Sequence, residues 1–539
     1  ASLINSEEGV LYAEISAFEE TNSFESISIN NNTIGDRVFM GYYSDDLYIT
    51  VVNGGQAKYD VSTPINVKQN NKIAVKYKAQ DFCFYLNGFK INASVGINGG
   101  TTPIGLSKLS FDRGDGVEPF YGKTKALAVY KTALTDANLR SLTYPSAVAT
   151  TFDLNFNTIA DDFTFTRGSE ATFVNAQGLI QSTASNDAPR LDYSTGAKAF
   201  LLEPQSTNII PYSEDFTLGW NLSDATIVSN STISPNGLSN ASKLTTSVFG
   251  GGLSDSFAVS DGNLTFSLFV KKGTTNGIRL RIDAATDSNG FFDLVNNTVY
   301  SSDNEASIKS FGNGWYKISV SANITSFSKV AIYTTDGSSN YENGSVYIYG
   351  AQLEQNSFST SYIPTSGASA TRNQESCTNA TPVINSEEGT LYFEASALVD
   401  ENDRRISLSD GSLNNYVSIG YSRFTGNIVG EIFSNGVSQN LNWGATGITQ
   451  INNNKFALSW GNGTMKFYVN GIQTLTTTIT SPIGMNVLNF AAGNNALTMY
   501  ANTKDLKVYP KALADVQLQD LTSWGSFTEM ANALNYTIK

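Results

Sequence analysis

Residues 4–14, INSEEGVLYAE, recur almost unchanged as INSEEGTLYFE at residues 384–394. Each copy starts with a polar segment and runs into a Leu-Tyr-x-Glu stretch that is rich in strand-forming residues. Self-similarity between distant parts of a chain is the signature of a repeated structural unit. The two stretches therefore predict that one β-domain begins twice.

Two further features repeat in the same order. Residues 84–88 (FYLNG) match residues 467–471 (FYVNG), and Asn-Gly is a strong hairpin signal because both residues tolerate positive φ. Each copy also closes alike, YGKTKALAVYKTALTDANLRSLT at 121–143 against YANTKDLKVYPKALADVQLQDLT at 500–522. These closing segments predict a strand followed by one short helix.

The start of that helix differs between the copies. Thr135 can cap it in the first copy, whereas Ala514 occupies the capping position in the second. We therefore expect the second helix to fray more easily.

The tail at 524–539 predicts one more short helix. Ser526 and Glu529 have the spacing of a capping box. The helix would either pack back on the preceding domain or dock onto a partner subunit. Its expected apolar face consists of Phe527, Met530 and Leu534.

Length and composition indicate several β-domains. A chain of 539 residues is too long for one hydrophobic core, and only 15% of its residues are charged. Between the two copies, strand-like runs such as 264–270 (LTFSLFV) alternate with Asn-Gly turns. The expected parts are a first repeated domain at 1–146, a connector at 150–210, a central β-domain at 211–366, a linker at 367–382, a second repeated domain at 383–523 and the tail at 524–539.

Charge and hydropathy exclude two classes of partner. The net charge of −14 disfavours nucleic acid, because binding to phosphates depends on clustered Lys and Arg. No run of about 18 apolar residues is present, so we expect no membrane insertion. Residues 1–5 also lack the pattern of a secretory signal.

The rare residue types exclude several kinds of site. The chain contains no histidine, which removes Ser-His-Asp and Cys-His catalysis and zinc sites built on histidine. Its two cysteines are too few for a disulfide scaffold. We expect Cys83 to be a buried hydrophobe and Cys377 to lie in the polar linker.

The repeated domain resembles the laminin-G/concanavalin-like superfamily. The resemblance rests on the Gly-x-Leu-Tyr opening, the hairpins at 72–88 and 455–471, and the closing strand and helix. It implies a two-sheet sandwich that binds glycans or serves as a spacer. The expected fold class is therefore all-β, with multi-domain antiparallel jelly-roll sandwiches and a few short helices.

The region between the copies contains a series of short segments in a fixed order. They are DFTFTRGS (162–169), PRLDY (189–193), LLEPQSTN (201–208), PYSEDF (211–216), GNGWY (312–316), GAQLE (350–354) and TSYIPT (360–365). With these segments, the region resembles a module of virion proteins in tailed bacteriophages. That resemblance implies a carbohydrate-binding jelly roll on the virion surface, outside the cell.

Tryptophans are the first candidates for sugar contacts, because a flat aromatic ring can stack on a sugar. Trp443 lies in a loop-like Asn-Trp-Gly context, and Trp220 is the second candidate. Trp315 and Trp460 are expected in the core.

A glycine-rich acidic segment, FDRGDGVE at 111–118, is a candidate calcium site. Asp112, Asp115 and Glu118 supply the oxygen ligands that calcium prefers, although their spacing does not fit an EF-hand. The alternative is a solvated acidic loop without a metal.

No catalytic residues are predicted. A glycosidase needs two carboxylates that face each other across the sugar. The adjacent pairs Glu7-Glu8 and Glu387-Glu388 would point to opposite faces of a strand, and no Glu-x-Asp-x-(x)-Glu run occurs. The sequence therefore predicts a protein that is not an enzyme.

The leading prediction is a phage virion protein, a tail fibre or head appendage, that adheres to host surface polysaccharide. We expect it to form homo-oligomers and to contact other virion proteins. A purely architectural head or tail component is the alternative. A polysaccharide-degrading tail enzyme is less favoured.

Overall fold

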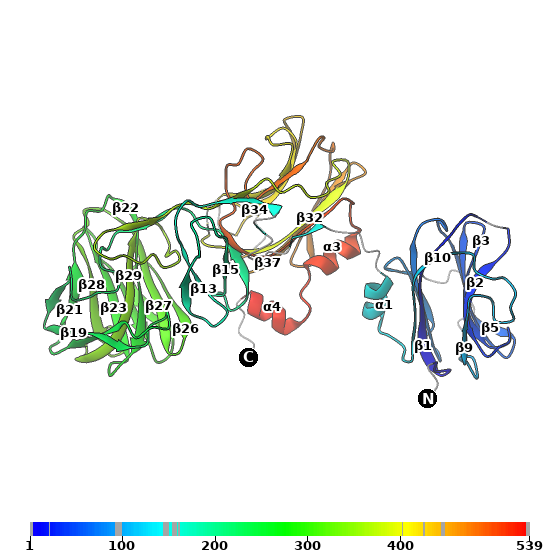
Figure 1. Ribbon diagram of the computed structural model, residues 1–539, viewed down its shortest axis with the longest axis horizontal. Helices are drawn as coiled ribbons and strands as arrows, with labels where there is room; N and C mark the ends of the chain where they lie inside the picture. Colours follow the sequence, from blue (N-terminus) through cyan, green and yellow to red (C-terminus); the bar gives the residue numbers. More distant parts are fainter. Residues whose placement is uncertain are drawn as a thin grey trace. The chain divides into compact units, whose positions relative to one another are not determined.

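The computed structural model describes residues 4–20, 22–91, 100–143, 150–152, 159, 162–400, 403–423, 426–442 and 448–534. The chain divides into two compact units, Ala1–Ala147 and Val148–Lys539. Each described unit consists of antiparallel β-sheets with a few short helices (Figure 1). The predicted all-β fold of antiparallel jelly-roll sandwiches is confirmed.

The first unit is a sandwich of two five-stranded sheets. One sheet has the order β10 (Gly122–Tyr130), β1 (Glu8–Ala17), β6 (Asn71–Lys78), β7 (Cys83–Leu86) and β8 (Phe89–Ile91). The other has the order β5 (Gln56–Pro64), β4 (Asp46–Asn53), β3 (Arg37–Tyr43), β2 (Glu25–Asn30) and β9 (Lys108–Ser110).

Both faces of β1 are buried. Leu11 and Ile15 point into the core between the sheets, whereas Val10 and Tyr12 pack with Leu139 of helix α1 (Asp136–Thr143). The helix therefore covers the outer face of this sheet, which is why the opening stretch is apolar on both sides.

The second unit ends in a sandwich with the same strand order. One sheet contains β41 (Ala501–Tyr509), β32 (Gly389–Ala397), β37 (Asn454–Gly461), β38 (Thr464–Val469) and β39 (Ile472–Thr478). The other contains β36 (Val437–Asn442), β35 (Ile428–Ser434), β34 (Tyr416–Tyr421), β33 (Arg404–Ser409) and β40 (Val487–Asn489).

The repeated INSEEG segment leads into the opening strand of each repeated sandwich and is held by the same hydrogen bonds in both copies. Its asparagine side chain, Asn5 or Asn385, accepts a hydrogen bond from the backbone N–H two residues later, at 3.0 Å in both copies. Its serine hydroxyl accepts the backbone N–H of a distant loop residue, at 2.8 Å from Leu106 and 2.9 Å from Met485. The motif is repeated because it holds the same loop in place twice.

The Asn-Gly hairpins also serve the fold. Asn87 and Asn470 both have φ of 49°, in the left-handed region that a tight hairpin turn requires. The backbone N–H of the following glycine donates to Thr143 or Thr522 at the end of the closing helix, at 3.2 and 3.1 Å. Turn and helix are thus joined identically in the two copies.

The closing helices begin differently, as their sequences indicate. The hydroxyl of Thr135 accepts the backbone N–H of Asn138 at 3.2 Å in α1. In α3 (Asp515–Thr522), Ala514 offers no side-chain cap, and the amide oxygen of Gln517 accepts its backbone N–H at 2.8 Å instead. Among the described residues, no helix reaches the length and apolarity of a membrane span.

The tail forms helix α4 (Phe527–Ala533), with Ser526 accepting the backbone N–H of Glu529 at 3.0 Å as predicted. The predicted apolar face is wrong at its first residue, because the side chain of Phe527 is 66% exposed. Ala531 is the buried contact of this helix. A small residue lets the short helix approach its neighbours closely, which the search for large apolar residues overlooked.

The central domain is a sandwich of two six-stranded sheets. One has the order β18 (Asn221–Ser223), β21 (Gly252–Asp255), β28 (Lys329–Thr335), β23 (Gly277–Asp283), β24 (Ser288–Asp293) and β25 (Thr298–Ser302). The other has the order β19 (Ala225–Thr232), β20 (Ala241–Thr246), β29 (Gly344–Glu354), β22 (Gly262–Lys272), β27 (Trp315–Ile324) and β26 (Glu305–Gly312).

The expected connector at 150–210 is not a separate segment. Strand β16 (Ala199–Leu201) pairs with β41, β15 (Arg190–Asp192) pairs with β16, and β11 (Thr150–Thr151) also pairs with β41. Strands β11, β15 and β16 thus extend a sheet of the last sandwich, whereas β13 (Thr172–Val174) forms a hairpin with β14 (Ile180–Ser182).

The expected linker at 367–382 is wrong as well. It contains β30 (Ala370–Arg372), which pairs with β17 (Ser206–Asn208), and β31 (Ser376–Thr378), which pairs with β12 (Thr164–Thr166). Cys377, expected in a polar environment, is fully buried. The chain thus enters and leaves the central domain through paired strands.

Candidate functional site

Of the two predicted sugar-stacking tryptophans, only Trp220 lies among the described residues. Trp443 lies outside the described residues. Trp220 is only 6% exposed, its ring lies 5.5 Å from that of Phe216, and its Nε1 donates to the carbonyl of Tyr212 at 3.3 Å. The prediction for Trp220 is corrected, because an indole packed inside the core presents no free face to a sugar.

The predicted calcium loop is closed by its own arginine. Arg113 donates to both carboxylate oxygens of Asp115 at 2.9 and 3.0 Å and to Glu118 at 3.0 Å. These hydrogen bonds hold the pKa of Asp115 below its ordinary value. Asp112 instead accepts the backbone N–H of Gly114 at 2.6 Å.

The loop therefore does not gather its three carboxylates around one point. Across the described residues, no group of three or more acidic, cysteine or histidine side chains is placed to hold a metal ion. Arg113, within the same segment, supplies the positive charge that was expected from calcium.

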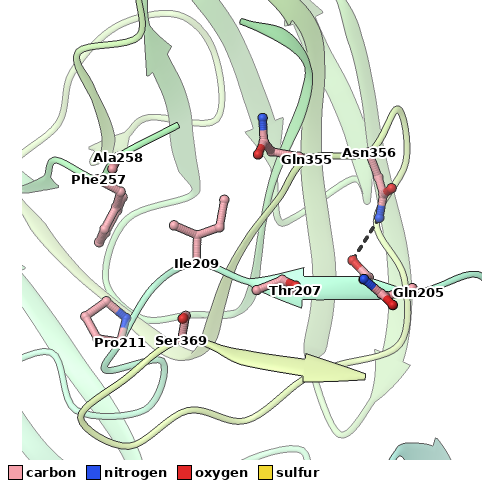
Figure 2. A pocket seen from close by; sticks show the side chains of 10 residues that line it. Gln205, Thr207, Ile209, Pro211, Phe257, Ala258, Gln355, Asn356 and Ser369 are labelled. Carbon is pink, nitrogen blue, oxygen red and sulfur yellow. Dashed lines mark hydrogen bonds between the residues drawn. The ribbon is translucent and has the colours of Figure 1, made fainter. Parts of the chain in front are cut away.

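A groove of about 620 Å³ lies on the central domain, next to strand β17 (Figure 2). Its lining comes from β17, the loop before β22 and the segment after β29. The lining residues are Gln205, Ser206, Thr207, Ile209, Pro211, Phe257, Ala258, Gln355, Asn356 and Ser369. Segments far apart in the sequence thus form one concave surface.

The groove has an apolar part and a polar part. Phe257, Ile209 and Pro211 lie toward one side of the view, and side-chain amides lie toward the other (Figure 2). The amide of Gln355 donates to the carbonyl of Ser260 at 3.1 Å. Gln205 is exposed, and its amide makes no hydrogen bond within the described chain. Its donors and acceptor remain open to a ligand.

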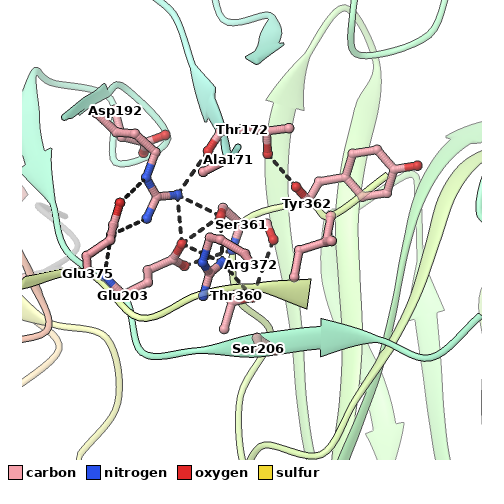
Figure 3. Close-up of polar contacts among 12 residues, drawn as sticks. Ala171, Thr172, Asp192, Glu203, Ser206, Thr360, Ser361, Tyr362, Arg372 and Glu375 are labelled. Atoms are coloured by element: carbon pink, nitrogen blue, oxygen red, sulfur yellow. Dashed lines mark hydrogen bonds and ion pairs between the residues drawn. The ribbon is translucent and has the colours of Figure 1, made fainter. Parts of the chain in front are cut away.

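A buried ionic network lies beside the strand that carries the groove (Figure 3). Arg190 donates to both oxygens of Glu375 at 2.9 and 2.5 Å and to Glu203 at 2.8 Å. Arg372 lies 2.8 Å from Glu203, and Arg167 lies 2.9 Å from Glu375. None of these five side chains is more than 4% exposed.

The network reaches the groove through β17. Arg372 donates to the carbonyl of Pro204, which precedes the strand. The hydroxyl of Ser206, within β17, donates to buried Glu354 at 2.6 Å and accepts from the amide of Asn356 at 2.8 Å. The groove wall is therefore held from beneath by charge-assisted hydrogen bonds, which preorganise it.

Acid should weaken this support. Burial acts to raise the pKa of Glu203, but the Arg372 and Arg190 guanidiniums and hydrogen bonds from Ser361 outweigh it and lower the pKa to about 2. Because the folded-state pKa lies below the ordinary 4.5, the stabilisation is complete above about pH 4.5 and is lost as the pH falls toward 2. We expect a loss on the order of 3 kcal/mol.

Tryptophan fluorescence can measure this loss, since all five tryptophans belong to the second unit. Urea unfolding at several pH values should give the free energy of unfolding of that unit. A Glu203→Gln variant should lose the part of the dependence below pH 4.5 that Glu203 contributes, and the other carboxylates with lowered pKa in this unit should retain theirs. An equal dependence in the variant and the parent would contradict this assignment.

The groove was not predicted from the sequence, although two of the segments named above contribute to it. The segment LLEPQSTN (201–208) contains Gln205, and GAQLE (350–354) directly precedes Gln355 and Asn356. Exposed amides directly beside buried strands were the available signal. The search for tryptophans passed over these shorter side chains.

Comparisons with known proteins place the chain only among distant structural neighbours. No protein-family model and no curated protein matches it. A CBM40 domain of Ruminococcus gnavus IT-sialidase, bound to α2,3-sialyllactose, is 18% identical over 26% of this chain and 84% of that chain, with a TM-score of 0.22. Domains LG4-5 of mouse laminin α1 are 11% identical over 71% and 85%, with a TM-score of 0.20.

A third structure corrects one prediction. A leech intramolecular trans-sialidase is 11% identical and aligns with 96% of this chain and 95% of its own, with a TM-score of 0.23. The prediction that the protein is not an enzyme is withdrawn in view of this finding. A likeness this distant assigns the chain no reaction.

Proposed function

We propose that the protein binds glycans through the groove of its central domain. The observation that carries this proposal is the pairing of an apolar wall, with Phe257 and Ile209, and the unbonded amide of Gln205. Sugars present apolar C–H faces beside hydroxyl groups, and sites of this composition suit both. The supported strand β17 lets the site form before the ligand arrives.

We further propose that the protein lies on the virion surface of a tailed bacteriophage and contacts host polysaccharide. The support is the resemblance of segments between 162 and 365 to modules of phage virion proteins. In this proposal, its partners are other virion proteins and further copies of itself. An antiserum against the protein should label the surface of particles of a phage that encodes it. Particles of that phage that stay unlabelled would exclude this location.

Glycan binding can be tested with immobilised bacterial capsular and O-chain polysaccharides. For a polysaccharide that the protein binds, Phe257→Ala should weaken binding about two- to tenfold, because a stacked ring contributes roughly 0.5–1.5 kcal/mol. Gln205→Ala should weaken it as well. Phe527→Ala is the matched control, since Phe527 is 66% exposed in α4 and does not line the groove.

The outcomes separate the alternatives. Loss of affinity in the groove variants but not in Phe527→Ala supports the groove as the site. Unchanged affinity in Phe257→Ala and Gln205→Ala would exclude the groove. Failure to bind any surface polysaccharide would favour the architectural alternative, in which the sandwiches act as spacers.

A further inference from the structure

A second surface of the central domain carries an unusual arginine. Strand β23 alternates, with Ile278, Leu280 and Ile282 fully buried in the core. Arg279 and Arg281 therefore point to the outer face of the six-stranded sheet that contains β23. This face is separate from the groove, whose lining includes no residue of β23, β24 or β28.

Aromatic side chains flank Arg279 across the sheet. Its register partners are Tyr333 on β28 and Phe291 on β24. The guanidinium carbon lies 5.1 Å from the ring centre of Phe291, 5.3 Å from that of Tyr333 and 5.5 Å from that of Tyr341. Cation–π contacts at these distances fix the orientation of the charged group.

The neighbouring positions keep this surface shallow. Gly252 is the register partner of Tyr333 on β21, and a Cβ there would lie 2.8 Å from the tyrosine ring. On the other side, the partner of Phe291 is Ser301, a small residue. The row across the sheet therefore presents an arginine between two rings, with small residues at its ends.

Arg279 retains hydrogen-bonding capacity. Its Nε and Nη2 donate to the side-chain oxygen of Asn289, and its Nη1 donates to the hydroxyl of Tyr341. A guanidinium has five N–H groups, so one on each terminal nitrogen remains without an acceptor in the described chain. These N–H groups can donate charge-assisted hydrogen bonds to a carboxylate.

The charge of Arg279 is also uncompensated by a direct partner. Among the described residues, no carboxylate lies within ion-pairing distance of it, whereas Arg281 pairs with Asp283 and Asp287. Asp303 accepts from the amide of Asn289 rather than from Arg279. The guanidinium is thus the one position in this row that favours an added negative charge.

We propose that this face is a second glycan-binding site, which selects a sugar bearing a carboxylate. The carboxylate accepts the two free N–H groups of Arg279, and the apolar face of the sugar packs on Phe291 or Tyr333. The inference extends the proposed function, since both treat the central domain as glycan-binding. It differs in the residues used and in the ligand chemistry selected.

Calorimetric titration with two probes tests this inference. The probes are a trimer of galacturonic acid and the same trimer with its carboxylates methyl-esterified. The parent protein should bind the acid at least tenfold more tightly, because hydrogen bonds between charged groups are about twice as strong as neutral ones. Arg279→Gln should reduce this preference to about twofold or less, and Arg279→Lys should retain part of it.

Two controls make the test specific. Arg279→Gln should remain folded under the conditions of the titration, with a cooperative urea transition by tryptophan fluorescence. Phe257→Ala, in the groove, should leave the ratio of the two affinities unchanged.

Equal binding of the two probes, no binding of the acid, or a preference that survives Arg279→Gln would each overturn the inference. If the preference depends on Arg279 but Phe257→Ala has no effect on polysaccharide binding, the second site stands and the groove does not. If the groove variants lose binding while the acid is not preferred, the reverse holds.

Discussion

Replacing Glu375 with glutamine is expected to lower the free energy of unfolding of the second unit by about 3–5 kcal/mol. Glu375 is 1% exposed and accepts hydrogen bonds from both Arg190 and Arg167. Removing its charge leaves the side chain of Arg167 without a carboxylate and Arg190 with Glu203 alone. Water cannot replace the lost partner at fully buried guanidiniums, so the cost is that of an unpaired internal charge.

Urea unfolding followed by tryptophan fluorescence measures this change in the second unit alone, because the first unit contains no tryptophan. Glu305→Gln is the matched control, since Glu305 is exposed on β26 and forms no ion pair in the described chain. It should change the free energy by no more than about 0.5 kcal/mol. If Glu375→Gln lowered the free energy of unfolding by less than about 1 kcal/mol, the buried ionic network would not stabilise the second unit.

Phe490→Ala is expected to cost a similar amount, about 3–5 kcal/mol. The ring of Phe490 is fully buried and lies 5.4 Å from Phe163, 5.5 Å from Phe200 and 6.3 Å from Phe393. Phe163 and Phe200 belong to the expected connector, and Phe393 belongs to β32 of the last sandwich. Truncating Phe490 leaves a cavity where these parts share one core.

The same fluorescence measurement checks this prediction. Phe163→Ala should destabilise the same transition, because its ring contacts Phe490 and Phe152. Phe249→Ala, with a side chain that is 77% exposed, should have little effect. If Phe163→Ala left the unfolding midpoint unchanged, the connector would be independent of the sandwich core.

The fold class could be predicted from the sequence because its signals are local. The INSEEG segment, the Asn-Gly turns and the closing helix each depend on a few adjacent residues, such as Asn5, Asn87 and Thr143. These residues make the same contacts in both copies. A repeated local pattern therefore reported a repeated fold.

The strands that lead into and out of the central domain, β12, β17, β30 and β31, could not be predicted in the same way. The contacts that order them join residues far apart in the sequence. Arg372 and Glu375 lie in a polar stretch that resembles a linker, yet their partners Glu203 and Arg190 lie more than a hundred residues earlier. A polar stretch is exposed to solvent unless the fold brings oppositely charged side chains to pair with it. The segments PRLDY and LLEPQSTN contain these partners, Arg190 and Glu203.

The candidate site shows the same limit. Trp220 was chosen for the size and shape of its ring, but large aromatic residues are also the residues that cores bury most effectively. The groove instead uses Phe257 and the amides of Gln205 and Asn356, which come from separate segments. Hydrogen bonds from Asn356 to Ser206 and from Ile209 to Leu353 bring two of these segments together, although they lie far apart in the sequence.

A crystal structure of the protein with an oligosaccharide from a polysaccharide that it binds would test the proposal of a glycan site most directly. We predict that the sugar lies in the groove, with its apolar face on Phe257 and its hydroxyls bonded to Gln205. An acidic sugar residue should also occupy the face around Arg279. An ordered oligosaccharide elsewhere, with the groove unoccupied, would contradict the account.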